Sequence, residues 1–287
     1  NNHEIVCVDD LSTGYKSNLS SVIKKIDFYE EKIELFDFNK HGDIDAIVHL
    51  AAQPSVPLSI TNFSDSSSSN LLGAIKVIDH CRLHHIPLVY ASSCAVYGNL
   101  EFGNDEIENV DLLSPYATDK YAMELYSTTA HKIYQLSSVG LRFFNIYGPR
   151  QDPSSPYSGV ISIFADKLLK GQNITINGGH QTRDFVYVVD AVNIIYRAIV
   201  LASNNSICET SNVLTGESVT IDALAEQMMN IRNGKVEVNY QSLAIGDPEQ
   251  SDGSTEKMVK LFTVELNKFK KLNNGLVDTF QYILNEN

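Results

Sequence analysis

The stretches IPLVYASSCAVYG (residues 86–98) and SPYATDK (residues 114–120) carry the strongest structural and chemical signals in this sequence. The first is an apolar, strand-like run that closes at Ser93, and the second opens an expected helix. Tyr116 and Lys120 lie four residues apart, which places them on one face of that helix, about one turn from each other.

The Ser93, Tyr116 and Lys120 set has the chemistry of an acid–base site. An ammonium group close to a phenol favours the phenolate and should lower the pKa of Tyr116 toward neutrality. Such a phenol is a general base for a hydroxyl proton, and Ser93 can hydrogen-bond the same substrate oxygen. Tyr-x-x-x-Lys alone is usually a solvated helix face, but the Ser-Ser strand end upstream favours the catalytic interpretation. We therefore predict these three residues as catalytic.

Strand-like and helix-like segments alternate along the first half of the chain. Strands are expected at residues 4–8, 45–50, 88–92 and 138–143, and helices at 71–84 and 116–134. Apolar strands separated by helices imply a parallel sheet covered on both faces. The sequence therefore predicts an α/β fold with a doubly wound parallel sheet.

The pattern becomes less regular after Gly148. Three prolines and a cluster of serines within residues 149–158 mark a loop. We expect residues 1–148 to form the first domain. Residues 149–287 should form mainly a smaller substrate-binding lobe, with some segments returning to the first domain. A second Ser-rich run, residues 64–69, is expected to be the loop and cap before the helix of 71–84.

The front of the expected sheet is incomplete. A dinucleotide-binding sheet begins with a strand, a Gly-x-x-Gly-x-x-Gly turn and a helix. No such glycine fingerprint occurs in the 287 residues, and the sequence begins where the second strand is expected. Because a sheet without its central first strand would hardly hold together, we expect this unit to lie outside the printed residues rather than to be dispensable.

Composition excludes several classes of function. The net charge of −13 argues against a nucleic-acid partner, since phosphates need a basic face. No apolar run is long enough to span a membrane, and no secretory signal is recognisable. Four cysteines without metal-ligand spacing suggest reduced thiols. We therefore expect a cytoplasmic protein with no bound metal.

An ordered series of motifs resembles the extended short-chain dehydrogenase/reductase family, in its nucleotide-sugar branch. The resemblance covers nearly the whole chain and implies a Rossmann-like NAD-binding domain over residues 1–148, with NAD as the cofactor. The motifs are the Asp9-Asp10 turn, LAA (50–52), Asn70, the Ser-Tyr-Lys set, LRFFNIYGPR (141–150) and RDFVYV (183–188).

The resemblance implies roles in cofactor binding for several residues. A carboxylate after the second strand, here Asp9, accepts hydrogen bonds from the adenosine ribose and would repel a 2′-phosphate, which selects NAD over NADP. Asp10 shares that task, although both aspartates are also ordinary turn residues. Small side chains let the cofactor pass close to the backbone, and Asn70 lies near the active centre or caps a helix. The expected cofactor-binding residues are Asp9, Asp10, Ala51, Ala52, Asn70, Tyr116 and Lys120.

The resemblance also implies a site for the nucleotide sugar. Arg183 should pair with the diphosphate, since a guanidinium suits phosphate oxygens, unless it forms a surface ion pair with Asp184 or Asp190. A second family arginine is replaced by Ala244, and Arg150 is an alternative cation. The expected substrate-binding residues are Ser55, Ser93, Asn145, Val160, Thr175, Asn177, Arg183 and Ser251.

Sister families differ in the two residues after the catalytic Ser or Thr. Dehydratases and decarboxylases of this branch carry carboxylates there, whereas this chain has Cys94 and Ala95, so the remaining reaction is 4-epimerisation. Residues 52–57 and 148–153 look most like bacterial UDP-N-acetylglucosamine 4-epimerases. Ser251 stands where galactose-only epimerases have a Tyr, which leaves room for a 2-acetamido group. The alternatives are a UDP-glucose/UDP-galactose 4-epimerase and another nucleotide-sugar reductase or dehydratase of the branch.

The family mechanism would use Tyr116 to take the 4-hydroxyl proton while NAD accepts the C4 hydride. The resulting 4-keto sugar would turn and receive the hydride on its other face. A homodimer through the helices of 71–84 and 116–134 is also expected from the family. The competing hypothesis is a non-catalytic nucleotide-binding protein, which the missing glycine fingerprint and Ala244 favour slightly.

Overall fold

A central parallel sheet organises the computed structural model, which describes residues 3–42, 44–155, 158–243 and 246–286. Its strands are β3 (Ile47–His49), β4 (Leu88–Ser93), β5 (Ser138–Phe143) and β9 (Cys208–Val213), in the order β3-β4-β5-β9. All neighbouring pairs are parallel. β4 and β5 are buried almost throughout, as expected for strands covered on both faces.

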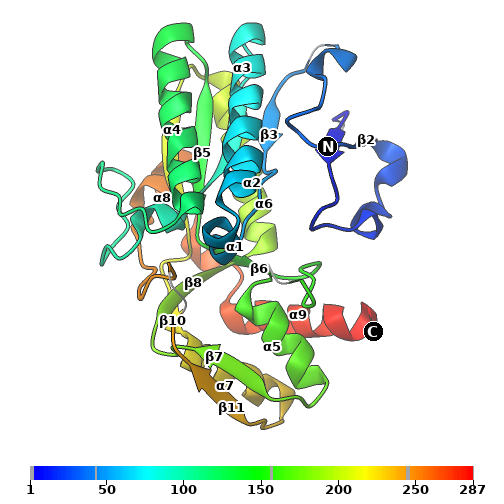
Figure 1. Cartoon of the computed structure of the whole chain (residues 1–287), viewed down its shortest axis with the longest axis vertical. Helices are drawn as coiled ribbons and strands as arrows, with labels where there is room; N and C mark the ends of the chain where they lie inside the picture. The colour runs from blue at the N-terminus through cyan, green and yellow to red at the C-terminus, as the bar shows by residue number, and fades with distance from the viewer. Residues whose placement is uncertain (1–2, 43, 156–157, 244–245, 287) are drawn as a thin grey trace.

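Helices cover the two faces of this sheet (Figure 1). Leu88 and Tyr90 contact α3 (Gly73–His84) and α4 (Pro115–Tyr134) in one apolar core. Val89 contributes to a second core with α6 (Val188–Asn204) and α8 (Glu256–Phe262). The side chains of successive β4 residues thus pack on opposite faces of the sheet, as the pleat of a β-strand requires. The doubly wound α/β fold predicted from the sequence is confirmed.

The N-terminal strands form a separate sheet. β1 (Val6–Asp9) and β2 (Asp27–Glu30) pair in parallel with each other, joined by short 3₁₀ turns, η1 (Lys16–Leu19) and η2 (Ile23–Lys25). Within the described residues they share no hydrogen-bonded ladder with β3. The following segment, which includes η3 (Phe38–Lys40), packs Ile33, Phe38 and Ile44 against the α3 core.

The expectation of a loop at residues 64–69 is wrong. After the short α1 (Val56–Thr61), α2 (Phe63–Ser67) runs through a π-helical turn at Ser68–Leu72 into α3. Serine has modest helix propensity, but tertiary contacts override it here. Ser66 is buried and donates to Gln53 Oε1 (3.1 Å), and Asn70 is fully buried inside the π-helical turn rather than capping a helix.

A second lobe lies below the central sheet in Figure 1. It contains a β6-β8-β10 sheet, a parallel β7-β11 pair, and helices α5, α7 and α9 around one apolar core. α6, β9 and α8 come after residue 148 but pack with the central sheet. The division at residue 148 stays a prediction. The bounds are β6 Asn145–Tyr147, α5 Val160–Leu169, β7 Ile174–Asn177, β8 Thr182–Tyr187, β10 Ser218–Thr220, α7 Ile221–Arg232, β11 Val238–Gln241, η6 Leu266–Lys268 and α9 Leu272–Glu286.

His49 closes β3 as a buried polar residue. Its side chain is 4% exposed, and within the described residues its Nε2 has no hydrogen-bond partner. Burial and, to a smaller extent, the nearby Lys120 ammonium together lower the pKa of His49 to about 3. The imidazole is therefore neutral in the folded protein across the physiological range.

We predict that His49→Leu reduces the acid sensitivity of the fold. Below the ordinary histidine pKa of 6.5, the unfolded chain binds a proton that folded His49 refuses until about pH 3. The free energy of unfolding is therefore unaffected by the titration of His49 above pH 6.5. Between pH 6.5 and pH 3 it decreases as the pH falls, by up to about 1.4 kcal/mol per pH unit. The free energy of unfolding, measured by urea denaturation between pH 8 and pH 4, should fall less steeply in the variant. Parallel curves would contradict the assignment.

Candidate active site

The three predicted catalytic residues meet where β4 ends and α4 begins. Ser114 caps α4, with its Oγ accepting from the N–H of Ala117 (3.2 Å), and a proline follows in the first turn. This cap places Tyr116 in the first turn and Lys120 one turn later. The Ser93 hydroxyl, at the end of β4, hydrogen-bonds Tyr116. The side chains of Ser93 and Lys120 are buried, and Tyr116 is half-buried.

The electrostatics differ from the sequence expectation. Burial raises the pKa of Tyr116 to about 12, and the Ser93 hydrogen bond partly opposes this rise. Lys120 does not bring the phenol to neutrality, because its Nζ donates to the Ala91 carbonyl (2.8 Å) and lies 5.7 Å from the centre of the Tyr116 ring. Burial also lowers the pKa of Lys120 to about 8. In the protein without ligands, Tyr116 is therefore a neutral phenol.

Cys94 and Ser251 lie beside Ser93. Ser93 Oγ accepts a hydrogen bond from the N–H of Ala95 (3.1 Å). Ser93 thereby caps the 3₁₀ turn η5 (Cys94–Tyr97). Burial raises the pKa of the Cys94 thiol to about 11, so it is a neutral group and not a nucleophile. Ser251 Oγ contacts Cys94 Sγ at 3.8 Å. Ser251, far away in sequence, is thus brought to the neighbourhood of Ser93.

Four of the predicted cofactor residues, Asp9, Asp10, Ala51 and Ala52, lie at or directly after the carboxyl ends of strands, and the other three lie on helices. Asp9 ends β1, and its Oδ1 accepts from the N–H of Leu11 (2.8 Å), while Asp10 accepts from Ser12. Ala51 and Ala52 follow β3. The Asn70 amide holds the backbone of Gln53 through two hydrogen bonds, N–H to Oδ1 (2.7 Å) and Nδ2 to the carbonyl (3.2 Å).

These residues fit a dinucleotide in part. Exposed Asp9 and the small residues 51–52 suit a ribose and a close backbone approach at the strand ends. Gln53 Nε2 is buried without a partner among the described residues, so a polar group is free there. The glycine-rich phosphate loop is not among the 287 residues.

Arg183 and Asn145 begin neighbouring strands of the second lobe. Arg183, on β8, is 7% exposed and pairs with Asp247 (NH2 to Oδ1, 2.5 Å), rather than with Asp184 or Asp190. Asn145 opens β6, and its buried Oδ1 has no partner within the described part of the chain. Ala244 lies outside the described residues.

The remaining predicted substrate residues lie on three other elements. Ser55 caps α1, whose Ser59 Oγ accepts from the N–H of Tyr116 (3.2 Å). Val160 begins α5, and Thr175 and Asn177 lie on β7. Their binding roles stay predictions.

Sequence reasoning missed a buried ion pair close to the three predicted catalytic residues. Glu124 of α4 and Arg142 of β5 form two hydrogen bonds, Nε to Oε1 (2.9 Å) and NH2 to Oε2 (2.6 Å). Glu124 continues the Tyr116–Lys120 series by four more residues, and this spacing could have revealed it. Arg142 gave no comparable signal, because a strand arginine usually points to solvent.

Within the described residues, no group of three or more His, Cys, Asp and Glu side chains could hold a metal ion. No helix in the described part of the chain is long and apolar enough to cross a membrane.

Comparisons with known proteins agree with this geometry. A putative UDP-glucose 4-epimerase of Methanocaldococcus jannaschii is 35% identical over 254 residues, covering 86% of this chain and 78% of that protein. The solved UDP-N-acetylglucosamine 4-epimerase of Methanobrevibacter ruminantium, in complex with UDP-N-acetylmuramic acid, superimposes with a TM-score of 0.90 at 30% identity, covering 99% of this chain and 91% of the other. UDP-glucose 4-epimerase of Thermotoga maritima gives 0.89 at 28% identity, with 100% and 92% covered.

The family model described as "NAD dependent epimerase/dehydratase family" matches residues 1–213. This range includes Ser93, Tyr116, Lys120 and the whole central sheet. The chain belongs to the NAD-dependent epimerase/dehydratase family.

Proposed function

We propose that this protein interconverts UDP-N-acetylglucosamine and UDP-N-acetylgalactosamine by inverting C4 through a 4-keto intermediate. NAD is the cofactor of its family. The observation that carries the proposal is the meeting of Ser93, Tyr116 and Lys120 at one end of the sheet, without a carboxylate at positions 94 and 95. A dehydratase or decarboxylase reaction lacks its acid–base group here.

Tyr116 is the proposed base. It takes the proton of the sugar 4-hydroxyl while the Ser93 hydroxyl hydrogen-bonds the same oxygen. NAD supplies the hydride acceptor at C4 when bound, and the positive charge of its oxidised ring favours the phenolate. Lys120, with a pKa of about 8, is protonated at neutral pH and holds the nicotinamide ribose in this proposal.

The sugar nucleotide is proposed to bind between the sheet end and the second lobe. Arg183 binds the diphosphate in place of its present partner Asp247, and Asn145 contacts the same group by donating through its Nδ2. Val160, Thr175 and Asn177 line the uridine pocket, and Ser55 contacts the sugar side. Asp9 and Asp10 hold the adenosine ribose and select NAD over NADP.

The preference for a 2-acetamido sugar rests on Ser251. Its contact with Cys94 puts this small side chain next to the catalytic serine, where a bulky residue would fill space. The relatives include enzymes named for UDP-glucose, UDP-N-acetylglucosamine and UDP-glucuronic acid. A UDP-glucose/UDP-galactose 4-epimerase is therefore the second candidate. Assay of purified protein with NAD against a panel of UDP-sugars for C4 inversion tests both.

We also propose a homodimer through α3 and α4. Large apolar side chains remain exposed on and beside these helices, including Leu72 (56%), Leu83 (58%), Leu125 (52%) and Ile133 (62%). Such residues on a face that the sheet does not use suit a two-fold helix bundle. The expected cytoplasmic location also stays a prediction.

The dimer is expected to dissociate when charge enters this face. At micromolar concentration, light scattering should give about twice the 31.9 kDa chain mass, and Leu125→Lys/Ile133→Lys should give the mass of one chain. Matched lysines at exposed Val189 and Val200 of α6 should leave the mass unchanged. A monomer in the unmodified protein removes the proposal.

Tyr116→Phe should reduce turnover by roughly 10² to 10⁴-fold, the usual contribution of an acid–base group, with UDP-sugar affinity little changed. The phenylalanine keeps the ring and removes the ionisable hydroxyl. Tyr126→Phe, at an exposed tyrosine of the same helix, is the control and should match the unmodified protein. Steady-state rates and calorimetric affinities decide, and near-normal turnover in Tyr116→Phe would exclude it from the mechanism.

Ser251→Tyr should lower kcat/KM for the two N-acetylated UDP-sugars and spare UDP-glucose and UDP-galactose. Overfilling a packed site costs roughly 1–3 kcal/mol, which is about tenfold or more in relative specificity. Ser251→Ala keeps the space and should leave the ratio between the two substrate pairs unaltered. Equal losses for both pairs in Ser251→Tyr would show that this residue does not gate the sugar site.

A further inference from the structure

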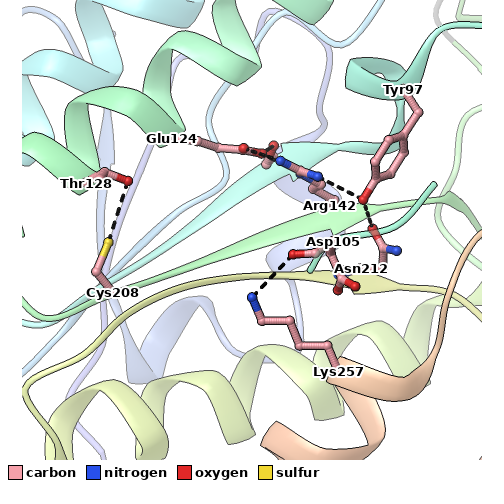
Figure 2. Close-up of polar contacts among 9 residues, drawn as sticks. Tyr97, Asp105, Glu124, Thr128, Arg142, Cys208, Asn212 and Lys257 are labelled. Atoms are coloured by element: carbon pink, nitrogen blue, oxygen red, sulfur yellow. Dashed lines mark hydrogen bonds and ion pairs between the residues drawn. The ribbon is translucent and has the colours of Figure 1, made fainter. Parts of the chain in front are cut away.

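The buried Glu124–Arg142 pair holds both sides of Ser93. Glu124 Oε1 accepts a hydrogen bond from the hydroxyl of Ser92, the residue before Ser93 on β4. Arg142 NH1 donates to the Tyr97 hydroxyl (2.8 Å), four residues after Ser93 at the end of η5. Figure 2 shows Arg142 between Glu124 and Tyr97. The segment that carries Ser93 is therefore fixed at both of its ends by one ion pair.

The same pair is tied to the helix that carries the base. Glu124 lies one turn beyond Lys120 on α4, so its contact with Ser92 joins the catalytic helix to the catalytic strand. Glu124 and Arg142 are 5% and 7% exposed, and the two hydrogen bonds between them form a planar, bidentate contact. Such a fork restrains orientation as well as distance, so α4 cannot slide along β5 without breaking it.

The network continues toward the proposed sugar side of the site. The Tyr97 hydroxyl donates to Asn212 Oδ1 (2.7 Å), and Asn212 Nδ2 donates to the carbonyls of Gly103 and Ser254 (both 3.1 Å). Figure 2 shows Asn212 next to Asp105, whose Oδ2 accepts from the Asn212 N–H (2.7 Å). Ser254 follows Ser251 by three residues. One continuous set of hydrogen bonds thus joins α4, the residues on either side of Ser93 and the segment that bears Ser251.

We propose that Glu124 and Arg142 are positioning residues, which hold the Ser93 hydroxyl against the Tyr116 phenol and reach the 251–254 segment through Tyr97 and Asn212. This inference rests on the proposed function for its kinetic consequence. Burying an ion pair is a poor source of net stability, since apolar residues of similar volume often replace such pairs without loss. The bidentate geometry and the attachment to Ser92 and Tyr97 point to orientation as its role. Displacement of reacting groups by about 1 Å lowers rates by roughly 10²-fold.

Two variants separate positioning from folding. Tyr97→Phe keeps the ring and the Glu124–Arg142 pair but removes the link to Asn212. Glu124→Met/Arg142→Met removes both charges together, so that neither is left buried and unpaired. Ser137→Ala is the control, because Ser137 donates to the carbonyls of Ala202 and Asn205 just before β5 begins, at the opposite end of that strand from Arg142.

The kinetic arm measures kcat and KM for the UDP-sugar, with each rate divided by the amount of bound NAD. The double variant should lose roughly 10²-fold in kcat with KM changed by less than about threefold, and Tyr97→Phe should lose less. Ser137→Ala should keep kcat within about twofold. An unchanged kcat per bound NAD in the double variant, even with a lowered melting temperature, would show a purely structural pair and overturn the proposal.

A crystal structure of the double variant gives a readout that does not need activity. The Ser93 and Tyr116 hydroxyls should move out of hydrogen-bonding distance, whereas in Ser137→Ala they should stay within it. Retention of this contact in the double variant overturns the proposal. If the unmodified protein epimerises no UDP-sugar, the proposed function fails, and the crystallographic result still decides the positioning role.

Discussion

The contact between the first half of α4 and the carboxyl end of β4 is the constraint on which the geometry of the candidate site depends. Lys120 reaches the Ala91 carbonyl, and Glu124 reaches Ser92, so two successive helical turns are bound to successive residues of the strand. β4 is itself central, paired with β3 on one side and β5 on the other. The serine and the phenol can therefore change their separation only if the middle of the sheet or the helix packing changes too.

The central layers of the fold were predictable because several independent sequence signals indicate the same strands and helices. The segments of β4 and β5 are mainly apolar, and α4 has a proline and a Ser cap at its start. The Ser-rich run was mispredicted because propensity favours loops for serine, while burial of Ser66 and Asn70 against the rest of the protein decides the outcome. Nothing within that run shows what packs on it, so local sequence could not reveal the helix.

The relative positions of Ser93, Tyr116 and Lys120 were more predictable from the sequence than their electrostatics. Spacing alone places Tyr116 and Lys120 on one helix face, but it does not show how deeply the two groups lie. Burial raises the pKa of Tyr116, so the phenol ionises less readily. Burial also lowers the pKa of Lys120, so the ammonium group loses its proton more readily. Holding a protonated Lys120 with a pKa of about 8 costs the fold roughly 3 kcal/mol below that pH. The unfavourable charge is tolerable because the Ala91 carbonyl accepts one of its hydrogens.

The positive charge of Arg183 is likewise compensated by a neighbouring group. The chain carries a net charge of −13, so its overall field does not attract an anionic nucleotide. Arg183 is 7% exposed, and a buried guanidinium without a partner would be costly, so Asp247 pairs with it in the unliganded protein. An anion that binds Arg183 must replace this carboxylate and therefore gains less than it would from a free arginine. Asp247 is 42% exposed in its side chain and can turn to water, whereas Arg183 is held by β8. The exchange thus favours a ligand that offers more than one negative oxygen to the guanidinium fork, which a diphosphate does and a neutral sugar does not.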